Sequence, residues 1–434
     1  MRQLNADSVG FYDQLSEATA WDEVREQEVD DRVAGIIRQV RDGGDTALLE
    51  LTNQLDKNPA TSLDTLHYDR NQLQQIADTC PIEQRQALEQ AAERIRHYHQ
   101  HQIAESWSYR DELGNLLGQK VTPIERAGIY VPGGKAAYPS SVLMNAIPAR
   151  VAGVRELVMV SPMPGGEPNP MVLAAALVAG VDRVYAVGGA QAVAALAFGT
   201  QSVPRVDKIV GPGNAYVASA KRQLFGRVGI DMIAGPSEIM VIADDSADPE
   251  WLAMDLLSQA EHDEEAQAVL VSDSQQVIDA VLQALEQLLP TLERSEIARA
   301  SIDNRGLAIR VANLAGAAEV ANRVAPEHLE LAVRDPEALL GQISNAGAIF
   351  LGSWSPEAVG DYCAGPNHVL PTSATARFSS PLGVYDFQKR TSLIGCTAAG
   401  ASEVAKIASV MARGESLTAH ARSAEYRIQS NPEE

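Results

Sequence analysis

The spacing of hydrophobic and polar positions changes once along the chain. Roughly the first hundred residues are rich in charge and carry apolar residues at helical spacing, which predicts long amphipathic helices over 22–41 and 82–101. From about Val121, short β-rich runs alternate with alanine-rich helical stretches. Such an alternation is typical of a parallel sheet covered by helices on both faces.

The predicted strands form two series. The first contains 128–131, 156–160, 183–187 and 207–210, with helices expected over 170–180 and 190–198. The second contains 238–243, 268–271, 307–311 and 348–351, and helices are expected later over 403–412 and 417–427. The expected fold is α/β, with two doubly wound, Rossmann-like parallel-sheet domains, helical appendages at both termini, and a cleft between or above the strand ends.

Composition limits the partners that the chain can have. With 434 residues, of which 45% are hydrophobic, the chain can bury more than one core. Its formal net charge of −22 argues against binding to nucleic acid or to an anionic membrane surface, because an acidic surface repels both. No apolar run reaches the length of a membrane span and the first residues do not resemble a signal peptide, so we expect a cytoplasmic location.

Cysteine and histidine usage narrows the possible metal chemistry. Cys80, Cys363 and Cys396 show no CxxC spacing, which indicates neither a disulfide framework nor a thiolate zinc site. Any metal must then use nitrogen and oxygen ligands. The three histidines within 97–101 lie in a polar segment that we expect to be a solvated helix surface without a metal role.

The segment 230–262 ends in two side chains that can bind a metal. Asp248 and Pro249 match an N-cap and a first helical residue, which predicts a helix as far as His262. Gln259 and His262 are then expected on one face of that helix near its end. An amide oxygen and a neutral imidazole suit Zn²⁺ or Mn²⁺ if a carboxylate and another histidine complete the set. In isolation, such a pair is more often a solvent-facing helix end.

Three predicted strand-to-helix joints are rich in glycine, at 131–135, 187–191 and 210–214. Glycine lets backbone N–H groups approach an anion at a helix N-terminus. None of the three matches the dinucleotide fingerprint or the P-loop, and glycine is common in any turn of this kind. Three such turns in one unit, all at the carboxyl ends of strands, still favour a nucleotide or phosphate ligand.

Glu327 and His328 place a carboxylate beside an imidazole, directly after Pro326. Neighbouring side chains diverge in a strand or a helix, so we expect the two to serve two different proton transfers. Deprotonation of an alcohol followed by activation of a water is one reaction that needs both. The simpler alternative is a surface glutamate beside a hydrogen-bonded histidine.

Two later segments carry further candidates. Asp361 and His368 lie in a glycine-punctuated loop that follows a predicted strand, and Glu415 and His420 lie where the last predicted helix begins. Taken separately, each of the four is as typical of a cap or a surface residue as of a ligand.

Taken together, these segments resemble the histidinol dehydrogenase family over essentially the whole chain. Residues 230–262 fit its signature, from Ile-Asp-x-x-Ala-Gly-Pro-Ser-Glu to Asp-Leu-Leu-Ser-Gln-Ala-Glu-His, and 325–330 and 360–368 also match. The family oxidises L-histidinol to L-histidine through L-histidinal, reducing two NAD⁺ in succession and consuming one water. Segment 225–229 is shorter than in other members, which affects one loop.

The resemblance implies a role for each site residue. His328 takes the hydroxyl proton, and Glu327 activates the water. The metal, Zn²⁺ with Mn²⁺ as a possible substitute, is held by Gln259, His262, Asp361 and His420. Substrate contacts fall on Ser237, Gln259, His262, His328, Asp361, His368, Glu415 and His420, and NAD⁺ contacts on Tyr130, Gln191 and Asn214. In the family the tail enters the partner's active site, so we expect a homodimer with shared sites.

The same resemblance suggests how the chain divides. Residues 1–24 are expected to form an N-terminal helical segment, and 382–434 a C-terminal helical arm exchanged with the partner subunit. Residues 25–110 with 238–381 are expected to form the first α/β domain, which carries the metal and catalytic residues. Residues 111–237 are expected to form the second α/β domain, which binds NAD⁺.

Two other functions compete with this interpretation. A paralogous dehydrogenase acting on another polar alcohol, such as a sulfonated diol, should depart at the residues that contact the imidazole, yet Glu415 and His368 are retained. A two-lobed α/β binding protein for a small metabolite needs neither Glu327 and His328 nor a set of metal ligands.

Overall fold

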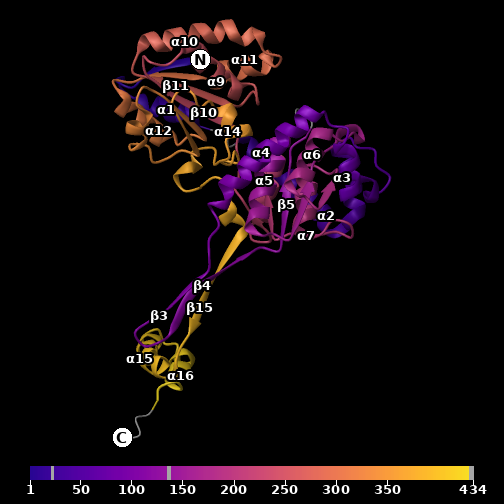
Figure 1. The fold of residues 1–434 in the computed structure, drawn as a ribbon, viewed down its shortest axis with the longest axis vertical. Coiled ribbons are helices and arrows are strands. Elements are labelled where there is room, and N and C mark those ends of the chain that lie inside the picture. The colour runs from indigo at the N-terminus through magenta and orange to yellow at the C-terminus, as the bar shows by residue number, and fades with distance from the viewer. Residues whose placement is uncertain (21–23, 134–137, 430–434) are drawn as a thin grey trace. The chain divides into compact units, whose positions relative to one another are not determined.

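The computed structural model describes residues 1–20, 24–133 and 138–429, and the side chains of all of these except 24–26. The chain forms two compact units, one made of Met1–Gln102 with Glu125–Phe387 and the other of Ile103–Ile124 with Gln388–Glu434. The first unit contains two six-stranded sheets, each flanked by helices (Figure 1). This confirms the expected α/β fold with two Rossmann-like sheets.

The first sheet is entirely parallel. Its strands are ordered β1 (Arg2–Asn5), β12 (Leu307–Arg310), β11 (Gln267–Ser272), β10 (Glu238–Ala243), β13 (His328–Ala332) and β14 (Ala348–Leu351). Alternate residues of β10 enter two different cores, with Val241 on one face and Ile242 on the other. The Val241 core packs on α9 (Pro249–Ala260), α10 (Gln275–Leu288) and α11 (Ser295–Arg305), and the Ile242 core on α1 (Phe11–Thr19), α12 (Leu314–Val324) and α13 (Pro336–Leu340).

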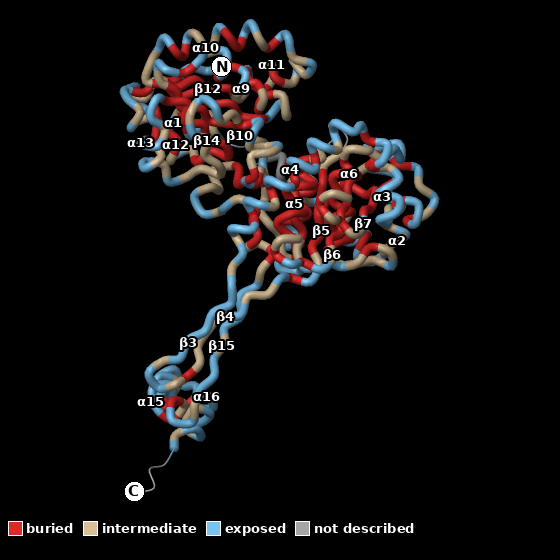
Figure 2. Tube along the Cα trace, viewed as in Figure 1, coloured by how far each residue is buried: buried red, intermediate tan, exposed pale blue. Residues whose placement is uncertain are grey.

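The second sheet is parallel except at one edge. Its strands are ordered β2 (His67–Tyr68), β7 (Arg183–Tyr185), β6 (Glu156–Val160), β5 (Arg126–Tyr130), β8 (Lys208–Val210) and β9 (Gly229–Ile230), and β2 runs antiparallel to β7. The helices that follow its strands are α5 (Pro139–Ala152), α6 (Pro170–Ala179), α7 (Gly189–Phe198) and α8 (Ala215–Leu224). Most residues of α5, α6 and α7 are buried and none is fully exposed (Figure 2), which explains the alanine-rich, apolar sequences of α6 and α7.

The N-terminal residues group differently from the division expected from the sequence. Strand β1 pairs with β12, so the first residues belong to the first sheet and are not purely helical, while 21–23 lie outside the described residues. Helices α2 (Val24–Leu55), α3 (Arg70–Ala77) and α4 (Ile82–Gln100) pack on α5 to α8, and β2 joins the second sheet. Residues 24–102 therefore cover the second sheet, not the one that contains 238–351.

Most predicted strands agree with the structure to within two residues, and 156–160, 238–243 and 348–351 agree in full. Strand β13 was not among them, although it lies between β10 and β14. Its sequence, His-Leu-Glu-Leu-Ala, is buried at every position. The strand is therefore neither a continuous apolar run nor an alternation of buried apolar and exposed polar residues, which are the two patterns that identify a strand.

The second unit contains an antiparallel sheet and two helices. Strand β4 (Leu116–Pro123) lies between β3 (Trp107–Arg110) and β15 (Gln388–Gly395), and α15 (Ala398–Gly414) packs on α16 (Thr418–Glu425). We had expected a helical arm from 382 to the end of the chain, but the tail also contains strand β15. Both faces of β15 are largely exposed (Figure 2), so its sequence lacks the alternation that identifies a half-buried strand.

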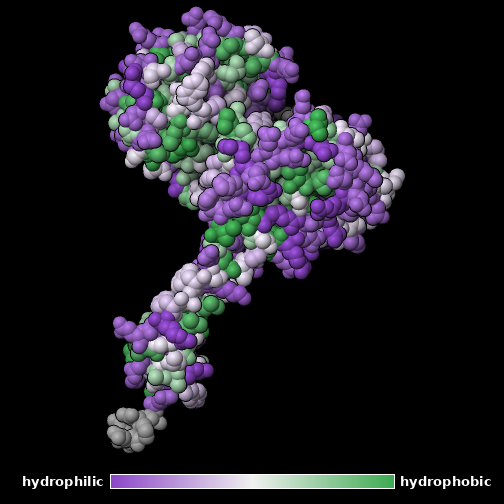
Figure 3. All heavy atoms as spheres, in the orientation of Figure 1, coloured by the Kyte–Doolittle hydropathy of each residue, from purple (hydrophilic) through white to green (hydrophobic). Residues whose placement is uncertain are grey.

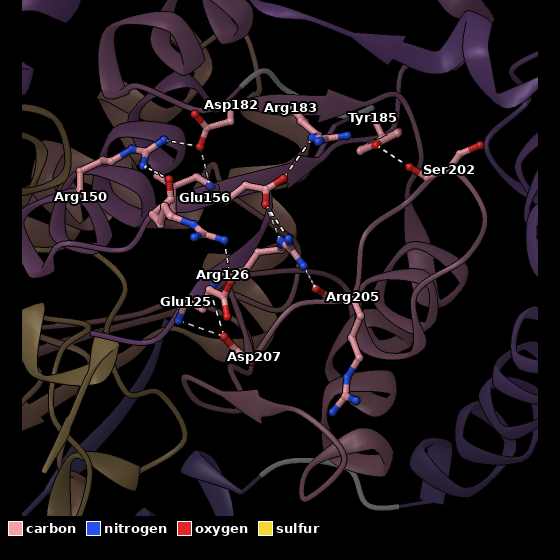
Figure 4. Close-up of polar contacts among 12 residues, drawn as sticks. Glu125, Arg126, Arg150, Glu156, Asp182, Arg183, Tyr185, Ser202, Arg205 and Asp207 are labelled. Atoms are coloured by element: carbon pink, nitrogen blue, oxygen red, sulfur yellow. Dashed lines mark hydrogen bonds and ion pairs between the residues drawn. The ribbon is translucent and has the colours of Figure 1, made fainter. Parts of the chain in front are cut away.

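An ion-pair network closes the amino ends of three strands in the second sheet (Figure 4). Glu156 at the start of β6 accepts from Arg126 at 2.7 Å and from Arg183 at 3.0 Å, and these arginines begin β5 and β7. Asp182 pairs with Arg150 and accepts the Leu157 backbone N–H at 2.7 Å. Charged side chains of the protein itself occupy this edge of the sheet. A ligand would therefore bind at the opposite edge, at the carboxyl ends of the strands.

Candidate active site

Two neighbouring strands bring the predicted acid–base pair together with a third carboxylate. Parallel pairing sets Ile239 of β10 opposite His328 of β13, so Glu238 and His328 both lie at the amino ends of their strands. The chain enters β13 through Ala325, which ends α12 with a φ of 53°, a conformation that non-glycine residues rarely adopt. Pro326 follows, and its carbonyl accepts the Gly347 N–H at 2.9 Å, which fixes the approach to the site.

His328 has one nitrogen anchored and the other available. Its Nδ1 lies 3.0 Å from the backbone carbonyl of Glu238, which can only accept, so Nδ1 carries the hydrogen. Its Nε2 is buried, makes no hydrogen bond and lies 3.4 Å from Asp361 Oδ1. Burial lowers the pKa of His328, but Glu357, Glu327 and Asp361 outweigh this and raise it well above the ordinary value. The ring is therefore arranged to accept a proton on Nε2.

Glu327 is held by the backbone of the same Glu238. Its Oε2 accepts the Glu238 N–H at 2.8 Å and lies 3.7 Å from His328 Nδ1. Burial raises the pKa of Glu327 to about 8, although His328 and the Glu238 N–H oppose the rise. A carboxyl group with such a pKa can exchange a proton near neutral pH. Because Glu327 approaches Nδ1 and Nε2 is directed elsewhere, the two groups can serve separate proton transfers.

Further carboxyl groups lie next to His328, and no local sequence pattern predicted them. Glu357, the first residue of α14 (Glu357–Tyr362), lies 3.7 Å from His328 Nδ1, and its N–H donates to Glu330 at 2.7 Å. The Glu330 carboxyl group is hydrogen-bonded to Asp255 of α9. Burial raises the pKa of Glu357 to about 8 and that of Asp255 to about 6, and burial with Asp255 raises the pKa of Glu330 well above its usual range.

The predicted metal ligands of the first unit lie around the same cluster. Gln259 is fully buried near the end of α9, and neither its amide oxygen nor its nitrogen has a hydrogen-bond partner. His262 was expected in the helix, but α9 ends at Ala260. His262 lies in the turn that follows, and its backbone N–H donates to the Gln259 carbonyl at 3.1 Å. Burial lowers the pKa of His262, whereas Asp361 opposes this. A neutral imidazole with a free lone pair results.

Asp361 lies within α14, not in an open loop as the glycines of this segment suggested. Burial acts to raise its pKa, but His328, His368 and His262 outweigh burial and hold the pKa at about 2. Asp361 is therefore a carboxylate surrounded by three imidazoles. That environment suits a cation ligand, because a metal requires its carboxylate to be deprotonated.

Residues 363–368 connect this cluster to helices of the second sheet. Arg94 of α4 donates to the carbonyls of Cys363 at 2.6 Å and of Ala364 at 3.3 Å. Asn367 Nδ2 donates to the Met144 carbonyl of α5 at 2.6 Å. His368 completes the connection, with Nδ1 2.8 Å from the Asp361 carbonyl and Nε2 3.3 Å from the Ser141 hydroxyl of α5.

The remaining predicted residues are placed as follows. Ser237 directly precedes β10 and is partly buried, next to Glu238. Glu415 and His420 belong to the second unit, where Glu415 follows α15, His420 lies in α16, and both are exposed. His99 was expected on a solvated surface but is fully buried, with Nδ1 2.8 Å from the Ile95 carbonyl.

The glycine-rich turns lie at the carboxyl ends of the second sheet, as predicted. Tyr130 ends β5, Gln191 lies in the first turn of α7, and Asn214 caps α8 by accepting two backbone N–H groups. The Tyr130 hydroxyl accepts the Gly189 N–H at 3.0 Å, which joins two of the turns. Gly211 has a φ of 112°, and a Cβ there would overlap the Tyr130 carbonyl, so this turn requires glycine. Residues 134 and 135 of the first turn lie outside the described residues.

Three charged residues that support these turns were missed. Lys221 and Asp231 form a buried ion pair, and both bond Gly211, the lysine to its carbonyl at 3.0 Å and the aspartate to its N–H at 2.8 Å. Asp56, directly after α2, accepts the Gly188 N–H at 2.7 Å. Asp231 lies within the signature segment and could have been suspected, whereas no sequence pattern connects Asp56 with residue 188.

Two Rossmann-like sheets with a buried acid–base pair at the strand ends define an α/β enzyme. A model of the histidinol dehydrogenase family matches residues 20–428. Histidinol dehydrogenase of Pseudomonas fluorescens strain Pf0-1 is 61% identical over 431 residues, which cover 99% of this chain and 98% of that protein. That of Methylococcus capsulatus strain Bath is 58% identical over 428 residues, covering 99% and 98%. The crystal structure of histidinol dehydrogenase from Elizabethkingia anophelis matches with a TM-score of 0.91 and 32% identity, covering 99% of this chain and 98% of that one. The chain belongs to the histidinol dehydrogenase family and is an oxidoreductase.

The Glu330 and Asp255 pair leads to a prediction about stability and pH. Both groups have a pKa raised by burial, so the stability they provide is complete below their unfolded pKa values and is lost as pH rises through about 6 and above. Glu330→Gln keeps a hydrogen bond to Asp255 and removes one buried charge. Between pH 5 and pH 8, metal-free Glu330→Gln should therefore lose less free energy of unfolding than the parent, by at least about 1 kcal/mol.

Urea unfolding at both pH values measures this difference. Glu337→Gln, on the exposed surface of α13, controls for the loss of a carboxylate. Equal losses in Glu330→Gln and in the parent would contradict the prediction.

Proposed function

We propose that the chain oxidises L-histidinol to L-histidine through L-histidinal, reducing two NAD⁺ and consuming one water, as the last step of histidine biosynthesis. Family membership supports the substrate, since the relatives at 58 to 61% identity over nearly their whole length are histidinol dehydrogenases. The observation that carries the chemistry is the arrangement of His328, whose Nδ1 is fixed by the Glu238 carbonyl and whose buried Nε2 faces Asp361 at 3.4 Å.

In this proposal His328 and Glu327 divide the proton transfers. His328 Nε2 accepts the substrate hydroxyl proton, while its Nδ1 remains bonded to the Glu238 carbonyl and keeps the ring in one orientation. Glu327 accepts a proton from the water that adds to L-histidinal, and its pKa of about 8 suits a base that must also release that proton. NAD⁺, when bound, supplies the hydride acceptor for both oxidations.

The residues of the first unit fit a bound cation. The amide oxygen of Gln259 is buried with no partner, His262 holds a lone pair, and Asp361 is ionised. These three donors, with His420 of the second unit, form a nitrogen and oxygen set that suits Zn²⁺, or Mn²⁺ in its place. The ion would orient the substrate by its imidazole and amino groups. A cation beside Asp361 would also offset one of the three negative charges, those of Glu357, Glu327 and Asp361, that raise the pKa of His328.

A second group of potential ligands competes with this set. Among the described residues, His328, Glu357 and Asp361 each place one ligand atom within 4.8 Å of the others. A metal bound there would occupy the nitrogen needed as a base, and it would leave the Gln259 amide buried and unsatisfied. We therefore assign the metal to Gln259, His262, Asp361 and His420.

We further propose that Tyr130, Gln191 and Asn214 contact NAD⁺, and that Ser237, His368 and Glu415 contact the substrate. The first three come from the three turns at the carboxyl ends of the second sheet, where dinucleotides bind in such folds. His368 Nδ1 lies 2.8 Å from the carbonyl of Asp361, and Ser237 directly precedes Glu238, whose backbone bonds Glu327 and His328.

The second unit supports a homodimer with shared active sites. Helix α15 presents Val404, Ile407 and Met411 along one face, with exposed fractions of 38%, 64% and 62%. Hydrophobic side chains reach the surface of this unit, as Figure 3 shows. An apolar helix face of this kind is typical of a protein interface. Glu415 and His420 lie on or after the helices of this unit, so an exchanged arm would deliver both to the partner's site.

The proposal is compatible with a cytoplasmic enzyme. Within the described part of the chain, every helix is too short or too polar to cross a bilayer. Membership of an oxidoreductase family excludes the alternative of a pure binding protein. The alternative of a sulfonated diol as substrate is decided by the assay below.

The assay incubates the purified chain, Zn²⁺ and excess NAD⁺ with a limiting amount of L-histidinol and counts NADH. About two NADH should form for each histidinol, because alcohol and aldehyde are oxidised in turn. One NADH for each histidinol, or turnover of a sulfonated diol with none of histidinol, would contradict the proposed function.

Glu327→Gln should separate the two oxidations. Oxidation of added L-histidinal should fall by about 10²–10⁴-fold, since the amide cannot accept the proton of water, whereas the first hydride transfer should fall far less. Stopped-flow NADH formation from each substrate measures the two effects, with Glu337→Gln as the surface control. Equal losses in both half-reactions would contradict the division of labour.

The metal assignment is tested by metal content. Chelation should abolish activity, and Zn²⁺ or Mn²⁺ should restore it. The parent should bind about one zinc ion per chain. Gln259→Leu and His262→Ala should each bind much less zinc, whereas Glu357→Gln should bind as much as the parent. Mass spectrometric metal analysis of dialysed proteins gives the result, and the opposite pattern would favour the ligand group that contains His328.

Sharing of the site is tested by complementation. His420→Ala and Gln259→Leu are each expected to be inactive, but a heterodimer of the two contains one intact site if the arm is exchanged. An equal mixture, unfolded and reassembled, should regain about one quarter of the parental activity. Absence of activity in heterodimers verified by mass spectrometry would show that each site is built from one chain.

A further inference from the structure

Asp56 bonds the turn at which the second sheet meets α7. One carboxylate oxygen, Oδ2, accepts the Gly188 N–H at 2.7 Å, and the other, Oδ1, accepts Gln191 Nε2 at 3.0 Å. Both partners lie at the start of α7, where Gly188 is the N-cap. The carboxylate therefore occupies the helix N-terminus that we had expected to receive an anion.

The bond to Asp56 determines which end of the Gln191 amide is left for a ligand. An ionised carboxylate has no hydrogen to give, so the amide must turn its NH₂ group toward Asp56. The opposite end, Oε1, is buried and has no hydrogen-bond partner, and Gln191 as a whole is fully buried. A buried acceptor without a donor is unfavourable, so the site is complete only when a ligand donates to it.

The charge of Asp56 excludes the usual ligand of such a turn. A phosphate at the N-terminus of α7 would need the Gly188 N–H that Asp56 already holds, and it would meet a negative charge at hydrogen-bond distance from that group. The Gly189 N–H is also taken, by the Tyr130 hydroxyl at 3.0 Å. The side-chain amide oxygen of Gln191, a neutral hydrogen-bond acceptor, lies at the same turn without a donor.

We propose that Asp56 is a positioning residue that presents Gln191 Oε1 to a neutral hydrogen-bond donor of the dinucleotide, a hydroxyl or amino group, and keeps phosphate out of this turn. The inference rests on the proposed function, because it takes Gln191 as a contact of NAD⁺. Asp56 acts through Gln191 and does not touch the reacting atoms.

Paired substitutions test the orientation of the amide. Asp56→Asn still accepts the Gly188 N–H but turns its own NH₂ toward Gln191, so the glutamine must flip and present its NH₂ group to the ligand. Gln191→Glu alone places a carboxylate against Asp56. Each single variant should raise both the Kd and the KM for NAD⁺ by about tenfold. In Asp56→Asn, which changes no group that touches the reacting atoms, kcat and the KM for L-histidinol should stay within about twofold of the parent. The double variant Asp56→Asn/Gln191→Glu restores a donor opposite an acceptor and should return both NAD⁺ constants to within about threefold of the parent.

Asp45→Asn is the matched control. Asp45 lies in α2, the helix that Asp56 directly follows, and accepts a backbone N–H and a side-chain hydroxyl, both from Ser202, without contacting the turn. It should leave the constants for NAD⁺ unchanged. Calorimetric titration of NAD⁺ provides Kd without turnover, and the Tm of each variant identifies loss of folding. If Asp56→Asn does not fold, the Gln191→Glu variant alone must still weaken NAD⁺ binding.

The outcomes separate the inference from the function it rests on. Parental binding of NAD⁺ by both single variants, or a folded double variant that binds no better than either, would overturn the role of Asp56 while the dehydrogenase activity stands. Loss of kcat without a change in KM would also overturn it. Failure of the parent itself to bind NAD⁺ would overturn the proposed function and the inference together.

Discussion

The parallel pairing of β10 with β13 is the contact on which the active site depends. It sets the peptide of Glu238 against the start of β13, so the N–H of that residue bonds Glu327 and its carbonyl bonds His328. One residue of a neighbouring strand thus orients both the carboxyl group and the imidazole. Because these bonds come from a buried backbone, they hold the two side chains without competing with water.

Around that pair, the site concentrates negative charge that the protein alone does not balance. Glu327, Glu357 and Glu238 each have a pKa raised by burial, to about 8, 8 and 7, which shows that the interior resists their ionisation. His328 opposes the charge of all three, and Arg305 also opposes that of Glu238. A cation at Asp361, or the amino group of a substrate, would offset this negative charge, which agrees with the ligands proposed for the site.

Features that depend on residues close together in the chain could be predicted from the sequence, and features that depend on distant residues could not. β10 and β6 were recognisable because an uninterrupted apolar run follows the first residue of each, whereas the polar residues His328 and Glu330 interrupt the apolar pattern of β13. Gln259 was found through its family signature, but its unsatisfied amide is visible only in three dimensions. Asp56 could not be found at all, since its partners lie more than a hundred residues away and no periodicity links them.

The strap of residues 363–368 makes the two sheets of the first unit mechanically dependent on each other. Arg94 of α4 bonds its first residue, Cys363, and Ser141 of α5 contacts its last, His368. It begins two residues after Asp361. If NAD⁺ binds at the second sheet, as proposed, any shift that it causes in those helices would reach the carboxylate beside His328 through a few hydrogen bonds. Residues 363–368 thus form a short connection through which a change at one sheet can displace side chains at the other.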